Sequence, residues 1–275
     1  MNTVAFIGCG NMGSALARAA CPSVGPENVY LANRTLAKAQ ALGDALGCHV
    51  AQNNGHALAH AQYVFLCVKP HLLSGVLAEL ASDLEGCAAR GEEKVLISVA
   101  AGVTLDTLRS FLPAKAQDIP LLRLMPNTCV EIGQGMSALC AAPNTPRRHI
   151  QAVQDILSHS GRVDLLEEPL MDAFTSVAGC GPAYVYPFLE ALADGGVMVG
   201  LPRRQAMEYA AQTLLGAAAM VLESGQHPGA LKDAVCSPGG STIAGVAALE
   251  ANGLRHAAIQ AVLAAYEKNK QLGKQ

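Results

Sequence analysis

Short apolar runs alternate with stretches of helical periodicity through the first 165 residues of the chain. The apolar runs cover residues 3–7, 29–32, 63–68, 95–99, 121–125 and 162–166. The helical stretches between them cover residues 36–46, 72–84, 104–111 and 150–158. This alternation predicts an α/β fold, in which a doubly wound parallel sheet carries helices on both faces.

The pattern changes after residue 165, where no further apolar run of strand length follows. Helical stretches there cover residues 167–178, 182–199, 202–224, 228–236 and 242–270. We therefore expect a sheet domain at 1–165 and an all-α domain at 166–275. The second domain is too small to cover all the apolar positions of its two long helices, so we expect a homodimer through this half, with larger oligomers left open.

Composition narrows the class of protein. The 275 residues are 51% hydrophobic and 15% charged, and their net charge of -3 gives no reason to expect nucleic acid or an anionic membrane as a partner. The nine cysteines are odd in number and show no CxxC spacing, so we expect buried thiols in a reducing compartment. With neither a secretion signal nor a membrane-spanning segment in the pattern, the expected location is the cytoplasm.

A glycine-rich turn follows the first apolar run. Gly8, Gly10 and Gly13 form a G-x-G-x-x-G motif between a predicted strand and a predicted helix. In a Rossmann-type domain the first glycine permits the tight turn, the second lets a pyrophosphate approach the backbone, and the third allows close packing of helix and strand. The amides at the start of the helix would face the phosphates. The motif therefore predicts a dinucleotide cofactor.

The second apolar run ends at Ala32 and is followed by Asn33 and Arg34. NAD-preferring folds usually place an acidic residue here, where it accepts hydrogen bonds from the ribose and repels a 2′-phosphate. Asn33 is neutral, and Arg34 can pair with that phosphate. We therefore expect NADPH as the cofactor, with NADH used less well.

Further strand ends are expected to line the same crevice, because ligands of such sheets bind beyond the carboxyl ends of the strands. These are residues 67–71, 98–102 and 125–128. Small residues in the second segment would let a nicotinamide ring lie against the backbone. Lys69 is a candidate catalytic acid, although a lysine before proline is equally typical of a turn.

Several longer motifs resemble one family, the pyrroline-5-carboxylate reductases. They are FIGCGNMG, CVKPH, SVAAGV, RLMPNT, AGCGPAYVYPFLEALADGGVMVGLPR, HPGALKDAV and SPGGSTIAGVAALE. The resemblance covers nearly the whole chain and implies a Rossmann domain followed by an all-helical dimerisation domain. It also implies the reduction of Δ1-pyrroline-5-carboxylate to L-proline, with hydride transfer to C5 of a protonated imine.

The resemblance implies two sets of site residues. The cofactor set is Ile7, Gly8, Cys9, Gly10, Asn11, Met12, Gly13, Asn33, Arg34, Asn54, Val68, Lys69, Pro70, Val99, Ala100 and Ala101. The substrate set is Glu168, Ser237, Gly240, Ser241 and Thr242. Two positions depart from the pattern. Ala234 stands where some relatives carry an asparagine, so a cofactor contact there is lost or rerouted, and Cys180 stands where many carry a serine.

The segment Ser237–Thr242 has the chemistry that this substrate needs. Gly239 and Gly240 allow successive amides to point at one place, and the start of the following helix favours an anion such as a carboxylate. Thr242 could then place its hydroxyl against the imine nitrogen and relay a proton that comes from water or another group. A simple helix cap by Ser241 or Thr242 is the alternative from the residues alone, and the family resemblance favours the catalytic role of Thr242.

Two other functions remain as alternatives. A β-hydroxyacid dehydrogenase begins with a similar glycine motif, but it would need a lysine in the first long helix of its second domain, and residues 182–190 contain none. A protein that senses NADPH without turnover would have no need of Thr242. His56 and His60 stand four residues apart, but no third ligand is evident, so no metal site is expected.

Overall fold

The computed structural model describes residues 2–272, and its contacts divide them into two compact units. The sheet unit comprises the described residues up to Cys180 together with those from Tyr266 onward, and the helical unit is Gly181–Ala265. The predicted domain boundary at residue 165 follows the change in secondary structure, whereas packing divides the chain after Cys180. The last described residues of the chain belong to the sheet unit because Asn269 donates hydrogen bonds to the carbonyl of Asp172 and to Oγ of Ser176.

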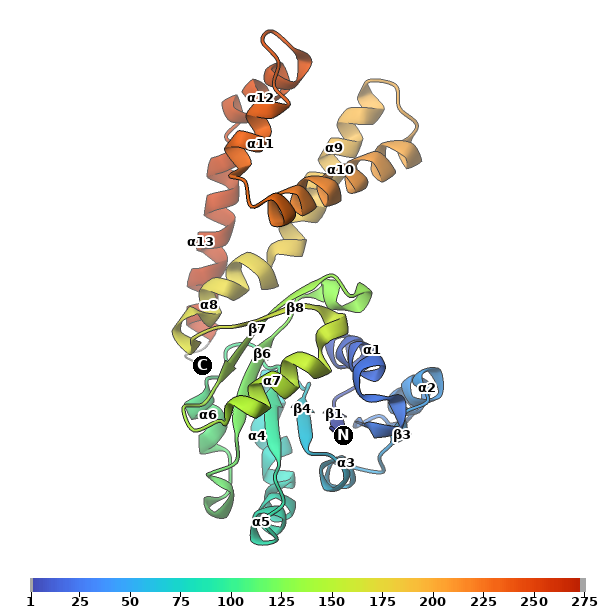
Figure 1. Ribbon diagram of the computed structural model, residues 1–275, viewed down its shortest axis with the longest axis vertical. Coiled ribbons are helices and arrows are strands. Elements are labelled where there is room, and N and C mark those ends of the chain that lie inside the picture. Colours follow the sequence, from blue (N-terminus) through green and yellow to red (C-terminus); the bar gives the residue numbers. More distant parts are fainter. Residues whose placement is uncertain (1, 273–275) are drawn as a thin grey trace. The chain divides into compact units, whose positions relative to one another are not determined.

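The sheet unit contains an eight-stranded sheet in the order β3-β2-β1-β4-β5-β6-β7-β8 (Figure 1). The strands are β1 Val4–Ile7, β2 Val29–Ala32, β3 His49–Val50, β4 Tyr63–Leu66, β5 Val95–Ser98, β6 Leu121–Met125, β7 Gly135–Ala141 and β8 Gly161–Leu165. All neighbouring pairs are parallel except β6 and β7, which are antiparallel. The predicted doubly wound α/β class is confirmed, with the last two strands, β7 and β8, running against the other six.

Helices surround this sheet and form all of the helical unit. They are α1 Asn11–Val24, α2 Leu36–Leu46, α3 Asn54–His60, α4 Pro70–Glu79, α5 Ala81–Ala89, α6 Leu105–Ser110, α7 Arg147–Ile156, α8 Met171–Phe174, α9 Gly181–Met198, α10 Arg203–Ser224, α11 Pro228–Ala234, α12 Ser241–Ala251 and α13 Leu254–Leu272. Two stretches predicted as single helices are each two helices. Residues 72–84 are interrupted at Leu80, and residues 242–270 at Gly253, whose φ of 74° ends α12.

Strands β3 and β7 were missed by the sequence pattern. Strand β3 has only two residues, which is too short to show a period. Strand β7 is built mainly from small residues, and Ser137 on it is fully buried. The first residue of β7, Gly135, has to be a glycine, because a Cβ there would lie 2.7 Å from the carbonyl oxygen of Ser160 on the neighbouring turn. Close packing, rather than β-branched residues, defines this strand.

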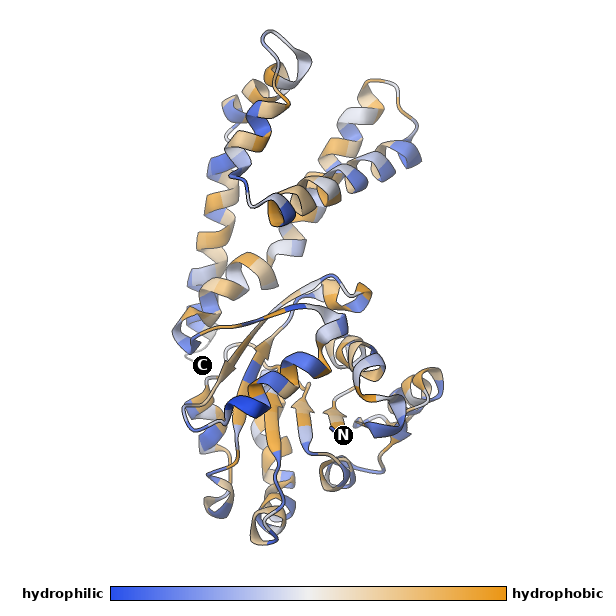
Figure 2. Ribbon diagram, in the orientation of Figure 1, coloured by the Kyte–Doolittle hydropathy of each residue, from blue (hydrophilic) through white to orange (hydrophobic). Residues whose placement is uncertain are grey.

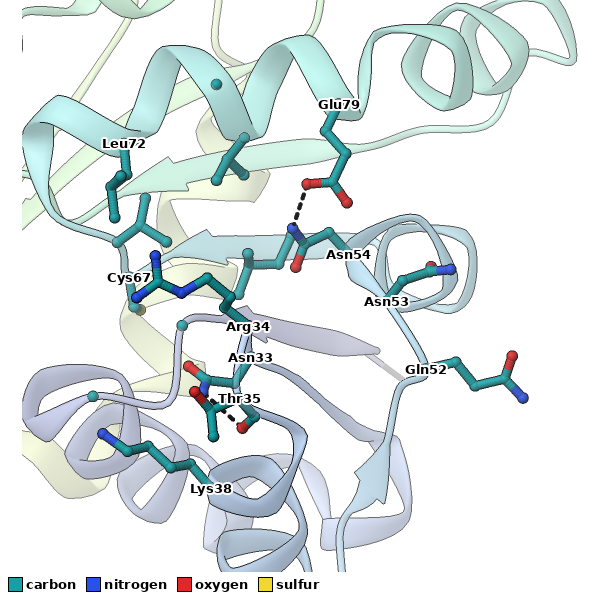
Figure 3. A pocket seen from close by; sticks show the side chains of 16 residues that line it. Asn33, Arg34, Thr35, Lys38, Gln52, Asn53, Asn54, Cys67, Leu72 and Glu79 are labelled. Carbon is teal, nitrogen blue, oxygen red and sulfur yellow. Dashed lines mark hydrogen bonds between the residues drawn. The ribbon is translucent and has the colours of Figure 1, made fainter.

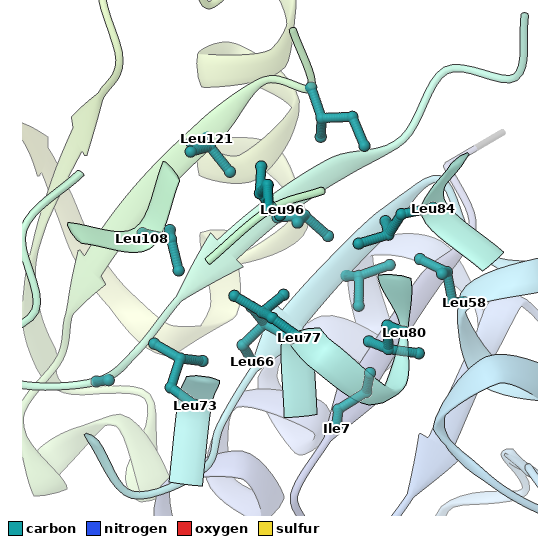
Figure 4. Packing of buried hydrophobic residues seen from close by; sticks show 14 of the residues in the cluster. Ile7, Leu58, Leu66, Leu73, Leu77, Leu80, Leu84, Leu96, Leu108 and Leu121 are labelled. Atoms are coloured by element: carbon teal, nitrogen blue, oxygen red, sulfur yellow. The ribbon is translucent and has the colours of Figure 1, made fainter. Parts of the chain in front are cut away.

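Alternation along the strands builds a core on each face of the sheet. In β1, Ala5 and Ile7 face the cluster covered by α3 to α6, while Val4 and Phe6 face the cluster covered by α1, α2 and α7. Figure 4 shows the first cluster, which is rich in leucine and includes Leu66, where β4 ends. Both faces of the central strands are therefore buried, and the carboxyl ends of the strands are held in fixed positions.

The helical unit buries little of its own apolar surface. Among its described residues, the buried apolar core consists of Ala193, Ala206 and Ala210, between α9 and α10. Large exposed apolar side chains remain on its helices, and Figure 2 shows the hydrophobic colouring running along α9, α10 and α13. They include Val185, Leu192, Tyr209, Leu215, Met220, Ile243, Leu249, Ile259 and Leu263.

Candidate functional site

Gly8 and Gly13, in the turn after β1, have the structural roles that the motif predicts, and Gly10 leaves the open space that its predicted role requires. Gly8 adopts a φ of 105°, and a Cβ there would lie 2.6 Å from the carbonyl oxygen of Cys67. A Cβ on Gly13 would overlap the carbonyl oxygen of Gly8 and come within 2.9 Å of the Cys67 Cβ, so α1 packs directly on the sheet only with glycine there. A Cβ on Gly10 would meet nothing within 4 Å. The open space above Gly10 is where a pyrophosphate can reach the backbone.

Asn33 ties the glycine turn to the end of β2. Its Oδ1 accepts a hydrogen bond from the Cys9 amide at 3.0 Å, and its Nδ2 donates to the Thr35 carbonyl at 2.9 Å. The Asn33 side chain therefore holds two backbone segments in place, in addition to bordering the cleft. The Cys9 amide is already paired and is not available to a phosphate, so the donors that remain are those at the start of α1.

A cleft of about 600 Å³ opens at the carboxyl ends of β1, β2 and β4 (Figure 3). Arg34 follows the end of β2, and Lys38 lies in the first turn of α2. Both line the same cleft and bring two positive charges to it. On the other side, Nδ2 of Asn54 donates to Oε2 of Glu79 at 3.0 Å, which links the start of α3 to the end of α4. The volume and the polar rim suit the adenosine and phosphate parts of a dinucleotide.

The cleft brings together only part of the predicted cofactor set. Those that line it are Ile7, Gly8, Gly10, Asn33, Arg34, Asn54 and Val68. Those that do not line it are Cys9, Asn11, Met12, Gly13, Lys69, Pro70, Val99, Ala100 and Ala101. Lining residues that the sequence reasoning did not name are Thr35, Lys38, Gln52, Asn53, Cys67, Leu72, Gly75, Val76 and Glu79. The signal for Lys38 was present, since it stands one helical turn after Arg34 on the helix that follows β2.

The next strand ends lie beside this cleft in the sheet order. Lys69 is the exposed N-cap residue of α4, and Pro70 is the first residue of that helix. The Lys69 side chain makes no capping hydrogen bond. After β5, the amide of Ala100 donates to Oγ of Ser98 at 3.3 Å, and Ala101 borders a small separate cavity. The backbone there is covered only by small side chains, so a flat ring can lie against it.

Burial keeps the thiols near the cleft protonated. It raises the pKa of Cys9 to about 11 and raises the pKa of Cys67 further. A thiol is nucleophilic only as the thiolate, so neither cysteine is a candidate nucleophile at neutral pH.

Glu168 joins the sheet to the segment that leads into the helical unit. Its Oε1 accepts from the Leu105 amide at 2.7 Å and from Nη1 of Arg123 at 2.5 Å. Arg123 lies on β6 with only 8% of its side chain exposed, whereas the Glu168 side chain is 28% exposed. Both described bonds use the same carboxylate oxygen, Oε1.

The Pro-Gly-Gly loop precedes α12 in the helical unit. Gly239 has a φ of 68°, and the Gly240 amide donates to the Ser237 carbonyl at 3.0 Å, which closes the turn. The N-cap residue of α12 is Gly240, so the alternative in which Ser241 or Thr242 serves as a simple helix cap is wrong. Both are instead in its first turn and exposed. Within residues 2–272 no side chain caps this helix, and its first amides remain available to an anion.

Two family models match the chain. Residues 3–102 match the model described as NADP oxidoreductase, coenzyme F420-dependent, and residues 168–272 match the model of pyrroline-5-carboxylate reductase dimerisation. The expected order of a dinucleotide-binding sheet domain and a helical dimerisation domain is therefore confirmed. No helix within residues 2–272 is long and apolar enough to cross a bilayer.

Proteins named pyrroline-5-carboxylate reductase match this chain along almost their whole length. The pyrroline-5-carboxylate reductase of Escherichia coli is 38% identical over 273 residues, which are 98% of each chain. That of Synechocystis is 41% identical over 249 residues, which are 90% of this chain and 89% of the relative.

Solved structures agree. A pyrroline-5-carboxylate reductase from Coxiella burnetii superposes with a TM-score of 0.89 at 30% identity and 98% coverage of both chains. The Plasmodium falciparum pyrroline carboxylate reductase, solved with NADP bound, gives a TM-score of 0.85 at 31% identity, covering 99% of this chain and 98% of that one. A sheet built around a dinucleotide turn, a matched dimerisation domain and full-length relatives lead to one conclusion: this chain belongs to the pyrroline-5-carboxylate reductase family of oxidoreductases.

Proposed function

We propose that the protein reduces Δ1-pyrroline-5-carboxylate to L-proline with NADPH. The observation that carries the proposal is the presence, in one member of this family, of both an open dinucleotide turn at Gly10 and an uncapped helix start at Gly240. Bound NADPH would supply the hydride for C5 of the imine. The residues of the chain then have to hold two anionic molecules and support a proton on the imine nitrogen.

The cleft favours NADPH over NADH. The 2′-phosphate of NADPH is a dianion that NADH lacks, and Arg34 and Lys38 put two cations on the wall of the cleft. Asn33, at the end of β2, has no charge that would repel a phosphate. We propose that Arg34 and Lys38 bind this phosphate, and that NADH is used with lower preference.

The rest of the predicted cofactor set belongs to the other end of NADPH. The first amides of α1, from Asn11 and Met12, would bind the pyrophosphate. The ends of β4 and β5 would contact the nicotinamide half, through Val68-Lys69-Pro70 and Val99-Ala100-Ala101. The small side chains after β5 leave the backbone accessible for this.

The Pro-Gly-Gly loop holds the substrate. Amides from Gly240 to Thr242, together with the Ser237 and Ser241 hydroxyls, would bind the carboxylate at the start of α12. The Thr242 hydroxyl would then donate to the imine nitrogen and relay a proton from water. Glu168 would act through Oε2, the carboxylate oxygen that neither Leu105 nor Arg123 uses.

We propose further that the protein works as a homodimer in the cytoplasm. The exposed apolar residues of α9, α10, α12 and α13 would be covered by a second copy, which accords with the dimerisation model matched at residues 168–272. A larger assembly would repeat this homodimer as its building unit.

Turnover with purified protein tests the function. NADPH should be consumed, as followed by its ultraviolet absorbance, only when pyrroline-5-carboxylate is added, and proline should accumulate in equal amount. NADPH binding without consumption would instead identify a sensor. Consumption with 3-oxoacid substrates alone would identify a β-hydroxyacid dehydrogenase.

A pair of threonine variants tests the role of Thr242. Thr242→Ala should lower kcat about a hundredfold while the Kd for NADPH stays unchanged, because the hydroxyl acts only on the reacting imine. Thr213→Ala is the matched control, since Thr213 is an exposed threonine of the same unit whose hydroxyl donates to the Tyr209 carbonyl. Equal rates for the two variants would remove Thr242 from the mechanism.

A further inference from the structure

Two cysteines that are far apart in the sequence meet on the outer side of the sheet unit. Cys21 lies near the end of α1, and Cys48 lies between α2 and β3, 27 residues later. Their Sγ atoms are 3.3 Å apart and share a hydrogen bond. Every cysteine of the chain is free in this structure. The two sulfurs need to approach by about 1 Å to reach the length of a disulfide bond, roughly 2.05 Å.

The environment of this pair differs from that of the other buried thiols. The hydrogen bond from Cys48 and the nearby Arg18 lower the pKa of Cys21, against the effect of burial. The shared proton correspondingly raises the pKa of Cys48. Burial alone raises the pKa of Cys9 to about 11, and burial also dominates at Cys140, whose pKa is about 11. Of the two thiols, Cys21 is therefore the one that gives up its proton first, while Cys48 keeps its own.

Access to the pair is limited but present. Cys21 retains 9% of its surface, and Cys48 is half-buried. A small oxidant such as a hydroperoxide can reach a thiolate that a bulky reagent cannot. When a partly exposed second thiol lies beside a thiolate, it can attack the sulfenic acid that the thiolate forms first and so produce a disulfide.

We propose that Cys21 and Cys48 form a modification site, at which a hydroperoxide converts the two thiols to an intramolecular disulfide. The Cys21 thiolate attacks one peroxide oxygen, the O–O bond breaks, and Cys21 becomes a sulfenic acid while hydroxide leaves. The Cys48 sulfur then attacks the Cys21 sulfur, and the sulfenic oxygen leaves as water with the Cys48 proton. Each thiol loses one electron and one proton, and one hydrogen peroxide is reduced to two waters. A dithiol reductant reverses the bond.

The disulfide would tie together two segments that frame the cofactor cleft. Helix α1 begins at the glycine turn, and β3 leads directly to Gln52 and Asn53, which line the cleft. The small movement needed lets the cleft keep its shape, so the oxidised protein should bind NADPH within about twofold of the reduced protein. Closing a loop of this length constrains the unfolded chain and should raise the thermal midpoint by roughly 5–10 °C. The bond is a reversible lock on the cofactor-binding fold, independent of the hydride transfer proposed above.

Peptide mapping after peroxide treatment tests the proposal. The native protein is titrated with hydrogen peroxide, remaining thiols are alkylated, and digested peptides are read by mass spectrometry. The expected product is one cross-linked pair that contains Cys21 and Cys48, with the loss of two hydrogens, reversed by dithiothreitol. The thermal midpoint should rise on oxidation of the wild type and should not rise on oxidation of Cys21→Ser.

Serine variants locate the chemistry. Cys48→Ser should trap the Cys21 sulfenic acid, detectable with a dimedone probe, and Cys21→Ser should give no cross-link. Cys129→Ser is the matched control, because Cys129 is also half-buried, and it should cross-link like the wild type. Wild-type protein whose Cys21 and Cys48 peptides stay unlinked, or are oxidised no faster than Cys129, overturns the proposal even if a variant fails to fold.

Discussion

Alanine at Gly10 and alanine at Gly13 should have opposite effects, although the two glycines are three residues apart in one motif. At Gly10 the backbone is extended, with φ of -80° and ψ of -172°, and a methyl group would enter open space in the cleft. At Gly13 the methyl group would overlap the Gly8 carbonyl and press on Cys67, both part of the central sheet or its turn. The first change should therefore affect the ligand, and the second the fold.

The structure sets the size of each effect. Alanine is a poorer N-cap than glycine but reduces the entropy of the unfolded chain, so Gly10→Ala should change the free energy of unfolding by less than about 1 kcal/mol. The same methyl group in the path of the pyrophosphate should cost about 1–3 kcal/mol of binding, which is roughly 5- to 150-fold in Kd for NADPH. Gly13→Ala has backbone on one side that cannot yield, and should cost about 3 kcal/mol or more of stability.

Two measurements on each variant check this reasoning. Fluorescence titration gives the Kd for NADPH, and a thermal scan gives the midpoint of unfolding. Gly10→Ala should weaken binding with a midpoint near that of the wild type, and Gly13→Ala should lower the midpoint by several degrees. Wild-type affinity in Gly10→Ala would mean that the cofactor does not approach this backbone, and a stable Gly13→Ala would mean that α1 is not packed as the structure has it.

Other substitutions test the charges and helix starts. Arg34→Ala and Lys38→Ala should each raise the KM for NADPH about tenfold and leave that for NADH nearly unchanged, as steady-state kinetics can show. At Glu93, burial works to raise the pKa, but the Arg148 guanidinium and His149 lower it overall. Its ionisation therefore stabilises the fold above the usual carboxyl pKa and less as the pH falls through its lowered pKa. Glu93→Gln should lose about 0.5 kcal/mol at pH 7, and the difference from wild type should shrink as acid denaturation curves are taken to lower pH. Gly240→Asp would put a carboxylate at the start of α12, and it should raise the KM for pyrroline-5-carboxylate more than tenfold in a rate assay in which the uncharged control of the same shape, Gly240→Asn, changes less.

The sequence was sufficient for those parts of the fold that repeat a local rule. The apolar runs that became β1, β2, β4, β5 and β6 alternate or are buried on both faces, and the glycine motif has a spacing tied to one turn geometry. Strand β7 could not be found in this way, because Ser137 and its small neighbours are held by close packing against distant segments. Such packing leaves no periodic signal in the chain.

The site residues divide along the same line. Arg34 was found from its distance to the glycine turn, which the fold fixes. The bond from Asn33 to the Cys9 amide and the bond from Asn54 to Glu79 depend on how separate loops meet, and residue type alone does not encode that. The approach of Cys21 to Cys48 is of the same kind, since it arises only when α1 and the end of α2 are packed side by side.

The two helix starts that this protein would offer to its ligands are built alike. Gly10 caps α1 and Gly240 caps α12, both in extended backbone near φ of -80° and -77°, and neither helix has a side-chain cap within the described chain. Side-chain caps occur at Asn53, Thr104 and His227, and α2, α4, α5, α7, α8 and α10 lack one as α1 and α12 do. What α1 and α12 share is a glycine at the N-cap, where no side chain stands in front of the first amides. The uncapped amides at a helix start have no hydrogen-bond acceptor, so a bound phosphate or carboxylate accepts from them and is held there more tightly. Because each ligand completes the helix that receives it, NADPH should stabilise the sheet unit and the substrate carboxylate the helical unit, each by an amount that grows with ligand concentration over its Kd.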